Sequence, residues 1–166
     1  MIAIAILLTG CANSQSSYNY TISQNDVSAI SIDAPTKFSV SRVVVLANGV
    51  AEIMNSLNAT SIIVGRDISS TEKALENVPL ATSGHQVLPE EVIALKPDLV
   101  IIDASTGPKA AIAQIKSAGI RVVQTPERWT LEDISIKVAA VADAIGAPKQ
   151  GALLNTAMND AIKAKN

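Results

Sequence analysis

Histidine and cysteine each occur once in the 166 residues, and aromatic side chains make up only 2% of the chain. A single cysteine, Cys11, excludes an intramolecular disulfide. A single histidine, His85, excludes a metal site that is built from two histidines of this chain. With so few aromatic rings, the core has to be packed from Ile, Val, Leu and Ala.

The chain also lacks the charge and the motifs of several common functions. Its formal net charge is −2 and no basic stripe runs along it, which argues against a nucleic-acid partner. Neither G-x-G-x-x-G nor a Walker loop follows any predicted strand, so nucleotide binding is disfavoured. A Ser-His-Asp hydrolase is disfavoured too, because there is no G-x-S-x-G elbow.

Residues 1–11 form an apolar run that ends in Leu8-Thr9-Gly10-Cys11. The run is too short to span a bilayer, and it resembles a signal peptide that ends in a lipobox, where the cysteine is lipidated. No Lys or Arg precedes the run, although signal peptides carry a basic flank there. We expect a lipid anchor at Cys11 and an extracytoplasmic location; the alternative is a buried strand or helix that ends in Gly-Cys.

Residues 12–41 contain the tether and the segment that leads into the domain. The first part is rich in Ser, Asn and Gln, and this composition cannot bury enough apolar surface to offset the entropy of ordering. Tyr18 and Tyr20 lie in the tether and are poorly placed to act as ligands. Weak alternation over residues 26–41 predicts a hairpin at the edge of the domain.

From Arg42 onward, short β-branched runs alternate with helical patterns. Strands are predicted at residues 42–47, 61–65, 99–102 and 120–124, and helices at 50–57, 89–95, 108–118, 131–145 and 150–165. In the helix 131–145, the inward positions are Ile134, Val138, Val141, Ala142 and Ile145. This alternation predicts an α/β fold with a Rossmann-like open parallel sheet flanked by helices. One binding domain would then occupy residues 42–149.

Ligands of open parallel sheets bind beyond the carboxyl ends of the strands. The loops at that end are residues 47–49, 66–71, 83–88, 103–108 and 126–130, so His85 belongs to the binding edge. Histidine is the commonest neutral metal ligand, and a haem needs only one protein ligand on each face. The alternative is that His85 is simply a solvated histidine on a surface loop.

The domain resembles the haem-binding lipoproteins of bacterial ABC haem importers. These belong to a wider class of substrate-binding proteins for haem, siderophores and cobalamin, and the resemblance covers Arg42 to the end of the chain. It is carried in order by Arg42-Val43-Val44-Val45-Leu46, Ala51-Glu52-Ile53, Ile63-Val64-Gly65-Arg66-Asp67, Ser83-Gly84-His85, Leu95-Lys96-Pro97-Asp98-Leu99-Val100, Thr106-Gly107-Pro108 and Ala118-Gly119-Ile120.

The resemblance implies haem as the transported ligand and His85 as an axial ligand of its iron. In many relatives a tyrosine after the second strand does this work, but residues 66–72 contain no tyrosine. Arg66 is the best cation for a haem propionate; the alternative is an ion pair with Asp67 or Glu72. The other pocket residues would be Ser69, Ser70, Thr71, Gly84, Gly107, Pro108 and Trp129.

The resemblance also implies a partner and a second lobe. A surface glutamate, here Glu90, would dock on the ABC transporter permease; the alternative is an acid favoured at a helix start by the macrodipole. Such proteins have two lobes joined by a long helix, and residues 150–166 resemble the start of that helix. We therefore expect a single N-terminal lobe that lacks the second axial ligand and delivers haem to a permease. The alternatives are a siderophore or cobalamin carrier and a small α/β enzyme.

Overall fold

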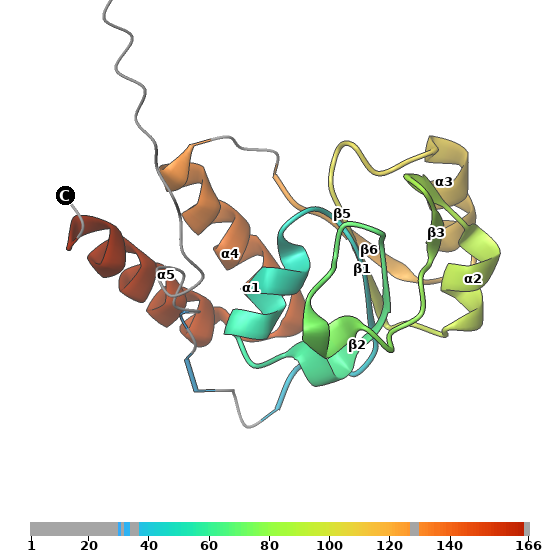
Figure 1. The fold of residues 1–166 in the computed structure, drawn as a ribbon. Coiled ribbons are helices and arrows are strands. Elements are labelled where there is room, and N and C mark those ends of the chain that lie inside the picture. Colours follow the sequence, from blue (N-terminus) through green and yellow to red (C-terminus); the bar gives the residue numbers. More distant parts are fainter. Residues whose placement is uncertain (1–29, 31, 34–36, 127–129, 165–166) are drawn as a thin grey trace, which may run out of the picture.

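The computed structural model describes residues 30, 32–33, 37–126 and 130–164. Alternating strands and helices follow one another as the sequence predicts (Figure 1). The strands are β1 (Val43–Leu46), β2 (Ile63–Arg66), β3 (Thr82–Ser83), β4 (Gln86–Val87), β5 (Leu99–Ile102) and β6 (Arg121–Gln124). The α-helices are α1 (Val50–Ser56), α2 (Pro89–Ala94), α3 (Lys109–Ser117), α4 (Leu131–Ile145) and α5 (Pro148–Lys163), and short 3₁₀ helices span Thr60–Ile62 and Lys73–Leu75.

Four strands form one parallel sheet in the order β2-β1-β5-β6. The two central strands, β1 and β5, pair in simple register from Val43 opposite Leu99 to Leu46 opposite Ile102. Every side chain of both strands is buried, as expected for apolar strands that are covered on both faces. The sheet confirms the predicted α/β class and directs all four carboxyl ends to the same edge.

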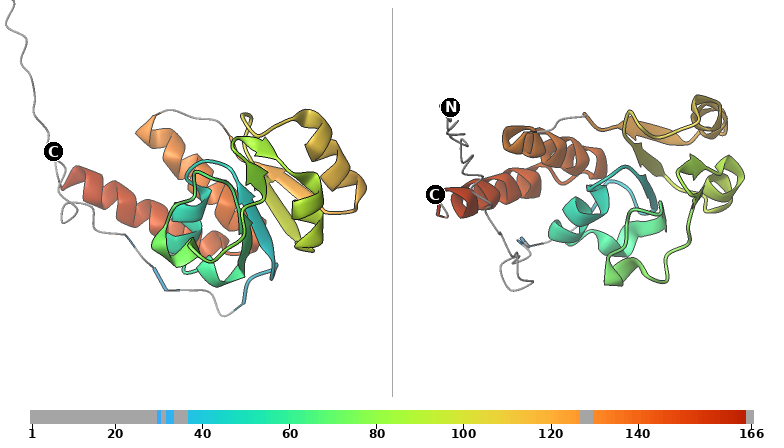
Figure 2. Two further views of the ribbon diagram at one scale, coloured as in Figure 1. Left: turned by 45° about the vertical axis from the view of Figure 1, so that its right-hand side comes forward. Right: turned by 45° about the horizontal axis from the view of Figure 1, so that its top comes forward.

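Helices cover both faces of the sheet, so the domain has three layers (Figures 1 and 2). Helices α1, α4 and α5 enclose one half of the core, in which Met54, Leu57 and Ile145 are fully buried. Helices α2 and α3 enclose the other half, around Val100 and Ile115. The described part of the chain contains no helix that is long and apolar enough to cross a membrane.

The segment before β1 packs on the domain without forming a strand in its described residues. Ile30, Ile32, Phe38 and Val40 contact the core beside α1, and the Ser39 amide donates to the Ile145 carbonyl at 2.9 Å. A hairpin over residues 26–41 was predicted, but residues 30, 32–33 and 37–41 contain no strand. The described apolar side chains of this segment pack against the core, so their pattern reflects packing and not strand pairing.

Three local predictions were wrong in detail. Ser61 and Ile62 belong to a 3₁₀ turn, and the strand begins only at Ile63. The last helix begins at Pro148, where a proline fits the first turn because its missing N–H is not needed. Ile134, predicted to face inward, is 38% exposed because it lies in the first turn of α4, beyond the part of the helix that is buried.

Candidate functional site

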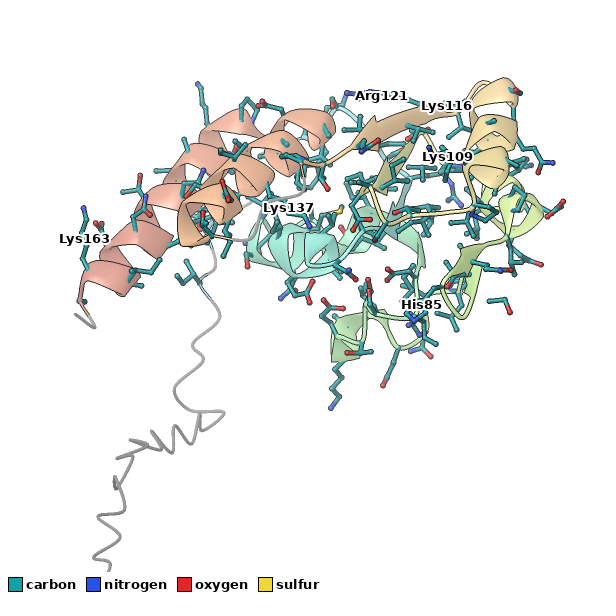
Figure 3. The ribbon with its side chains drawn as sticks, turned by 90° about the horizontal axis from the view of Figure 1, so that it is seen from above. His85, Lys109, Lys116, Arg121, Lys137 and Lys163 are labelled. Carbon is teal, nitrogen blue, oxygen red and sulfur yellow. The ribbon has the colours of Figure 1, made fainter. Side chains whose placement is uncertain are left out.

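His85 lies at the tip of a two-stranded hairpin that the sequence analysis treated as a loop. Strands β3 and β4 pair antiparallel, with Thr82 opposite Val87, and Gly84 and His85 form the turn between them. Gly84 has φ +57°, a left-handed conformation that glycine adopts without strain. The turn leaves the His85 side chain exposed at the carboxyl edge of the sheet (Figure 3).

The hairpin is tied to the domain on two sides. The Val87 amide donates to the Gly107 carbonyl at 2.9 Å, which joins the hairpin to the loop after β5. The Ala81 amide donates to the Arg66 carbonyl at 2.8 Å, which joins the segment before β3 to the end of β2. These hydrogen bonds hold the hairpin that carries His85 in place. A side chain that binds a ligand in one fixed geometry needs such support.

A hollow of about 100 Å³ lies beside His85, and we call it the histidine hollow. Four segments meet there: the ends of β1, β2 and β5 and the hairpin. Its lining is Leu46, Asn48, Asp67, Ile68, Thr82, Gly84, His85, Val87, Asp103, Ser105 and Thr106. Pockets that enclose a whole ligand usually measure 300–1,000 Å³, so this hollow contacts only one side of a ligand of that size.

Asp103 organises the floor of the histidine hollow. Its side chain is only 5% exposed, and its carboxylate accepts from the Asn48 amide at 3.1 Å and from the Ser105 amide and hydroxyl at 3.0 and 2.7 Å. The Thr106 hydroxyl accepts from the Asp103 amide, and both the Leu46 carbonyl and the Asp103 carboxylate lie within reach as acceptors of its hydrogen, at 2.8 and 3.0 Å. These bonds join the loop after β1 to the loop after β5.

The environment of Asp103 favours its ionised form. Burial raises its pKa, but hydrogen bonds from Ser105, Asn48 and Thr106 outweigh this, and the pKa of Asp103 lies below the ordinary value. Asp103 therefore stays negatively charged at neutral pH. Its oxygens accept hydrogen bonds from the two loops that frame the hollow.

The loop after β2 is held together by its own polar groups. The Arg66 guanidinium donates to the carbonyls of Leu75, Val78 and Ser70 at 3.0–3.1 Å. Ser69 and Ser70 donate their hydroxyls to the Asp67 carboxylate at 2.8 and 2.7 Å, and Ser70 is buried. These side chains build the loop, and their contact with a ligand stays a prediction.

The predicted site residues thus divide into groups. Gly84 and His85 line the histidine hollow, and Gly107 anchors the hairpin beside it, next to the exposed Pro108. Arg66, Ser69, Ser70 and Thr71 do not line it, whereas their neighbours Asp67 and Ile68 do. Trp129, Cys11 and the two tether tyrosines lie outside the described residues.

Asp67, Ile68 and Thr106 line the hollow but were not among the predicted site residues. Asp67 directly follows β2, and a polar residue just beyond a buried parallel strand is a usable signal for this edge. Among the described residues, no three His, Cys, Asp or Glu side chains gather in a way that would hold a bare metal ion.

Glu90 lies away from the histidine hollow, in the first turn of α2. Its side chain is exposed, and so is that of its neighbour Glu91. Neither position is among the residues that line the hollow. The geometry is compatible with a contact to another protein and does not involve Glu90 in ligand binding.

Three comparisons describe what the chain is similar to. It is 27% identical over 173 residues to the uncharacterized ABC transporter substrate-binding lipoprotein YvrC of Bacillus subtilis, covering 98% of this chain and 55% of that protein. The crystal structure of heme binding protein HmuT matches with a TM-score of 0.68 and 34% identity, over 71% of this chain and 39% of that one. Periplasmic heme-binding protein RhuT from Roseiflexus sp. RS-1 matches with a TM-score of 0.66 and 30% identity, over 70% and 45%.

These matches confirm the α/β fold, and the chain spans only part of each solved relative. The relatives are binding proteins and not enzymes, as the sequence predicted. The match to the family of periplasmic binding proteins extends over residues 43–165, from the start of β1 to just beyond the end of α5. The chain belongs to the periplasmic binding protein family.

Proposed function

We propose that this chain binds haem outside the cytoplasm and presents it to the permease of an ABC importer. The observation that carries the proposal is the placement of the single histidine, on a braced hairpin at the carboxyl edge of the sheet. Neutral imidazole is a standard axial ligand of haem iron. Haem-binding relatives at 30–34% identity share this lobe.

The chain spans 55% of the length of the curated relative and 39–45% of the two solved haem-binding proteins. The histidine hollow is small and would contact only one side of a ligand of haem size. A lipid anchor at Cys11 would hold the chain at the membrane beside its permease; the lipoprotein relative supports this.

Competition between ligands tests the proposed function. Hemin, a ferric siderophore and cobalamin are each titrated into the chain, and binding is followed by quenching of its intrinsic fluorescence. We expect saturable binding of hemin, with no displacement by the other two ligands. Saturable binding of a siderophore or of cobalamin in preference to hemin would assign the chain to those carriers instead.

Glu90 is proposed to dock on the permease. Glu90→Ala should reduce haem uptake by cells several-fold and leave hemin affinity unchanged, because the residue is exposed and remote from the histidine hollow. Glu91→Ala is the matched control, since Glu91 is equally exposed in the same helical turn and shares any macrodipole effect. Equal losses of uptake in both variants would show that the helix start, and not docking by Glu90, is responsible.

A further inference from the structure

A second, larger cavity adjoins the histidine hollow. It has a volume of about 490 Å³ and lies between α3 and the end of β6. Asp103 and Thr106 line both spaces, so the two are neighbouring parts of one surface. The residues that matter here are Asp103, Thr106, Lys109, Ile112, Lys116 and Gln124, and we call this cavity the lysine subsite.

Two lysines of α3 flank the lysine subsite. Lys109 and Lys116 are seven residues apart, which places them on the same helix face, about 10 Å apart along the axis. Ile112 lies between them and is 8% exposed, so it supplies an apolar floor. Both lysines are exposed, and within residues 37–126 and 130–164 neither side-chain ammonium group has a hydrogen-bond or ion-pair partner.

The opposite side of His85 is acidic. Asp67 lines the histidine hollow there, and it accepts hydrogen bonds from its own loop. Burial raises the pKa of Glu72, and the nearby carboxylates of Glu52 and Asp67 raise it further. The Arg66 guanidinium donates to backbone carbonyls, and Arg66 does not line the hollow.

Lys109 and Lys116 line the lysine subsite, Asp67 lines the histidine hollow, and the ionised Asp103 lines both. The lining side chains therefore carry net positive charge in the lysine subsite and net negative charge in the histidine hollow. In the view of Figure 3, Lys109 lies between His85 and Lys116. Lys109 begins α3 directly after the loop that both spaces share, whereas Lys116 lies in the last turn. An anionic group that extends from a ligand at His85 meets Lys109 first.

We propose that the lysine subsite binds the carboxylates of the ligand held by His85, with Lys109 as the main contact. This inference rests on the proposed function, and it fixes the orientation of the porphyrin. The propionate edge points toward α3, and the apolar ring edge lies toward Ile68, which is 46% exposed at the other side of the histidine hollow. Repulsion by the acidic side and attraction by the lysines favour the same orientation.

The test compares hemin with hemin dimethyl ester in the same detergent-containing buffer. Lys109→Ala should weaken hemin binding about five-fold, the scale of an exposed ion pair. Lys109→Glu should weaken it more than about ten-fold, since it replaces attraction by repulsion. Lys109→Arg should restore the affinity of the unmodified chain, and Lys116→Ala should lower it by less than about two-fold. None of these changes should alter the affinity for the ester.

Lys163→Ala is the control for loss of one positive charge, since Lys163 lies at the far end of α5 (Figure 3). Equal losses of hemin and ester affinity in the Lys109 variants, or no loss of either, would overturn the inference while leaving haem binding intact. If the unmodified chain does not bind hemin, the proposed function fails, and this inference fails with it. A loss of hemin affinity in Lys163→Ala as large as in Lys109→Ala would show that net charge, and not the subsite, is responsible.

Discussion

Replacing His85 by alanine is expected to weaken hemin binding by at least about 100-fold and to remove the absorption band of the iron–imidazole complex. Loss of groups that only support a metal ligand already costs 10–100-fold, so loss of the ligand itself should cost no less. The side chain is exposed at the tip of the hairpin, and its removal should leave the fold unchanged. Absorption titration of both proteins with hemin measures the effect.

Gln86→Ala is the matched control for this experiment. Gln86 is the next residue of the same hairpin and is also exposed, but it does not line the histidine hollow. It should bind hemin with the affinity and spectrum of the unmodified chain. A His85→Ala protein that keeps both would show that iron is bound elsewhere or that the porphyrin is held without axial histidine.

Asp103→Ala is expected to lower both the free energy of unfolding and the affinity for hemin. The substitution leaves the amides of Asn48 and Ser105 without their acceptor, and hydrogen bonds to a charged group contribute about 1.5–3 kcal/mol. We expect a loss of stability of about 2–3 kcal/mol. Hemin affinity should fall on the order of ten-fold, because the loops that frame the hollow and hold the hairpin are no longer joined.

Asp98→Ala provides the comparison, because Asp98 stands at the opposite end of β5. It accepts from the Ser41 amide and hydroxyl at 2.7 Å and from the Arg42 amide at 3.0 Å, as Asp103 accepts from its own loops. Its loss should reduce stability and leave hemin affinity unchanged under conditions where both variants are folded. Equal effects of the two substitutions on hemin binding would mean that Asp103 acts only through global stability.

The lowered pKa of Asp103 also predicts a pH dependence of stability. A carboxyl whose pKa is lower in the folded chain binds its proton more tightly when unfolded. Its contribution is therefore complete above the ordinary aspartate value of about 3.9 and is lost as pH falls below it. Denaturant melts should show a smaller loss of stability between pH 6 and pH 3 for Asp103→Ala than for the unmodified chain.

The framework of the fold followed from the sequence because local and tertiary signals agree there. The β-branched runs of β1 and β5 and the apolar spacing of α1 and α4 each predict one structure, and burial in the core enforces the same one. The β3–β4 hairpin escaped prediction because each strand has only two residues, too few for any alternation to be visible. Its pairing depends on contacts to Arg66 and Gly107, which no local pattern encodes.

The site was predicted at the level of loops and less well at the level of residues. Parallel topology places every strand end at one edge, so His85 and Asp103 could be assigned to that edge from the chain alone. Whether a polar side chain faces a ligand or its own loop depends on the loop's hydrogen bonds. Arg66 and Ser70 look like ligand contacts in the sequence, yet in the structure their donors are directed to backbone carbonyls and to Asp67.

Titration of the unmodified chain with hemin, followed by absorption, tests the central claim most directly. Imidazole coordinates haem iron, so binding should be saturable near neutral pH with one hemin per chain, and it should produce the absorption band of an iron–imidazole complex. Absence of saturable hemin binding at neutral pH, or saturable binding without that band, would contradict haem coordination by His85.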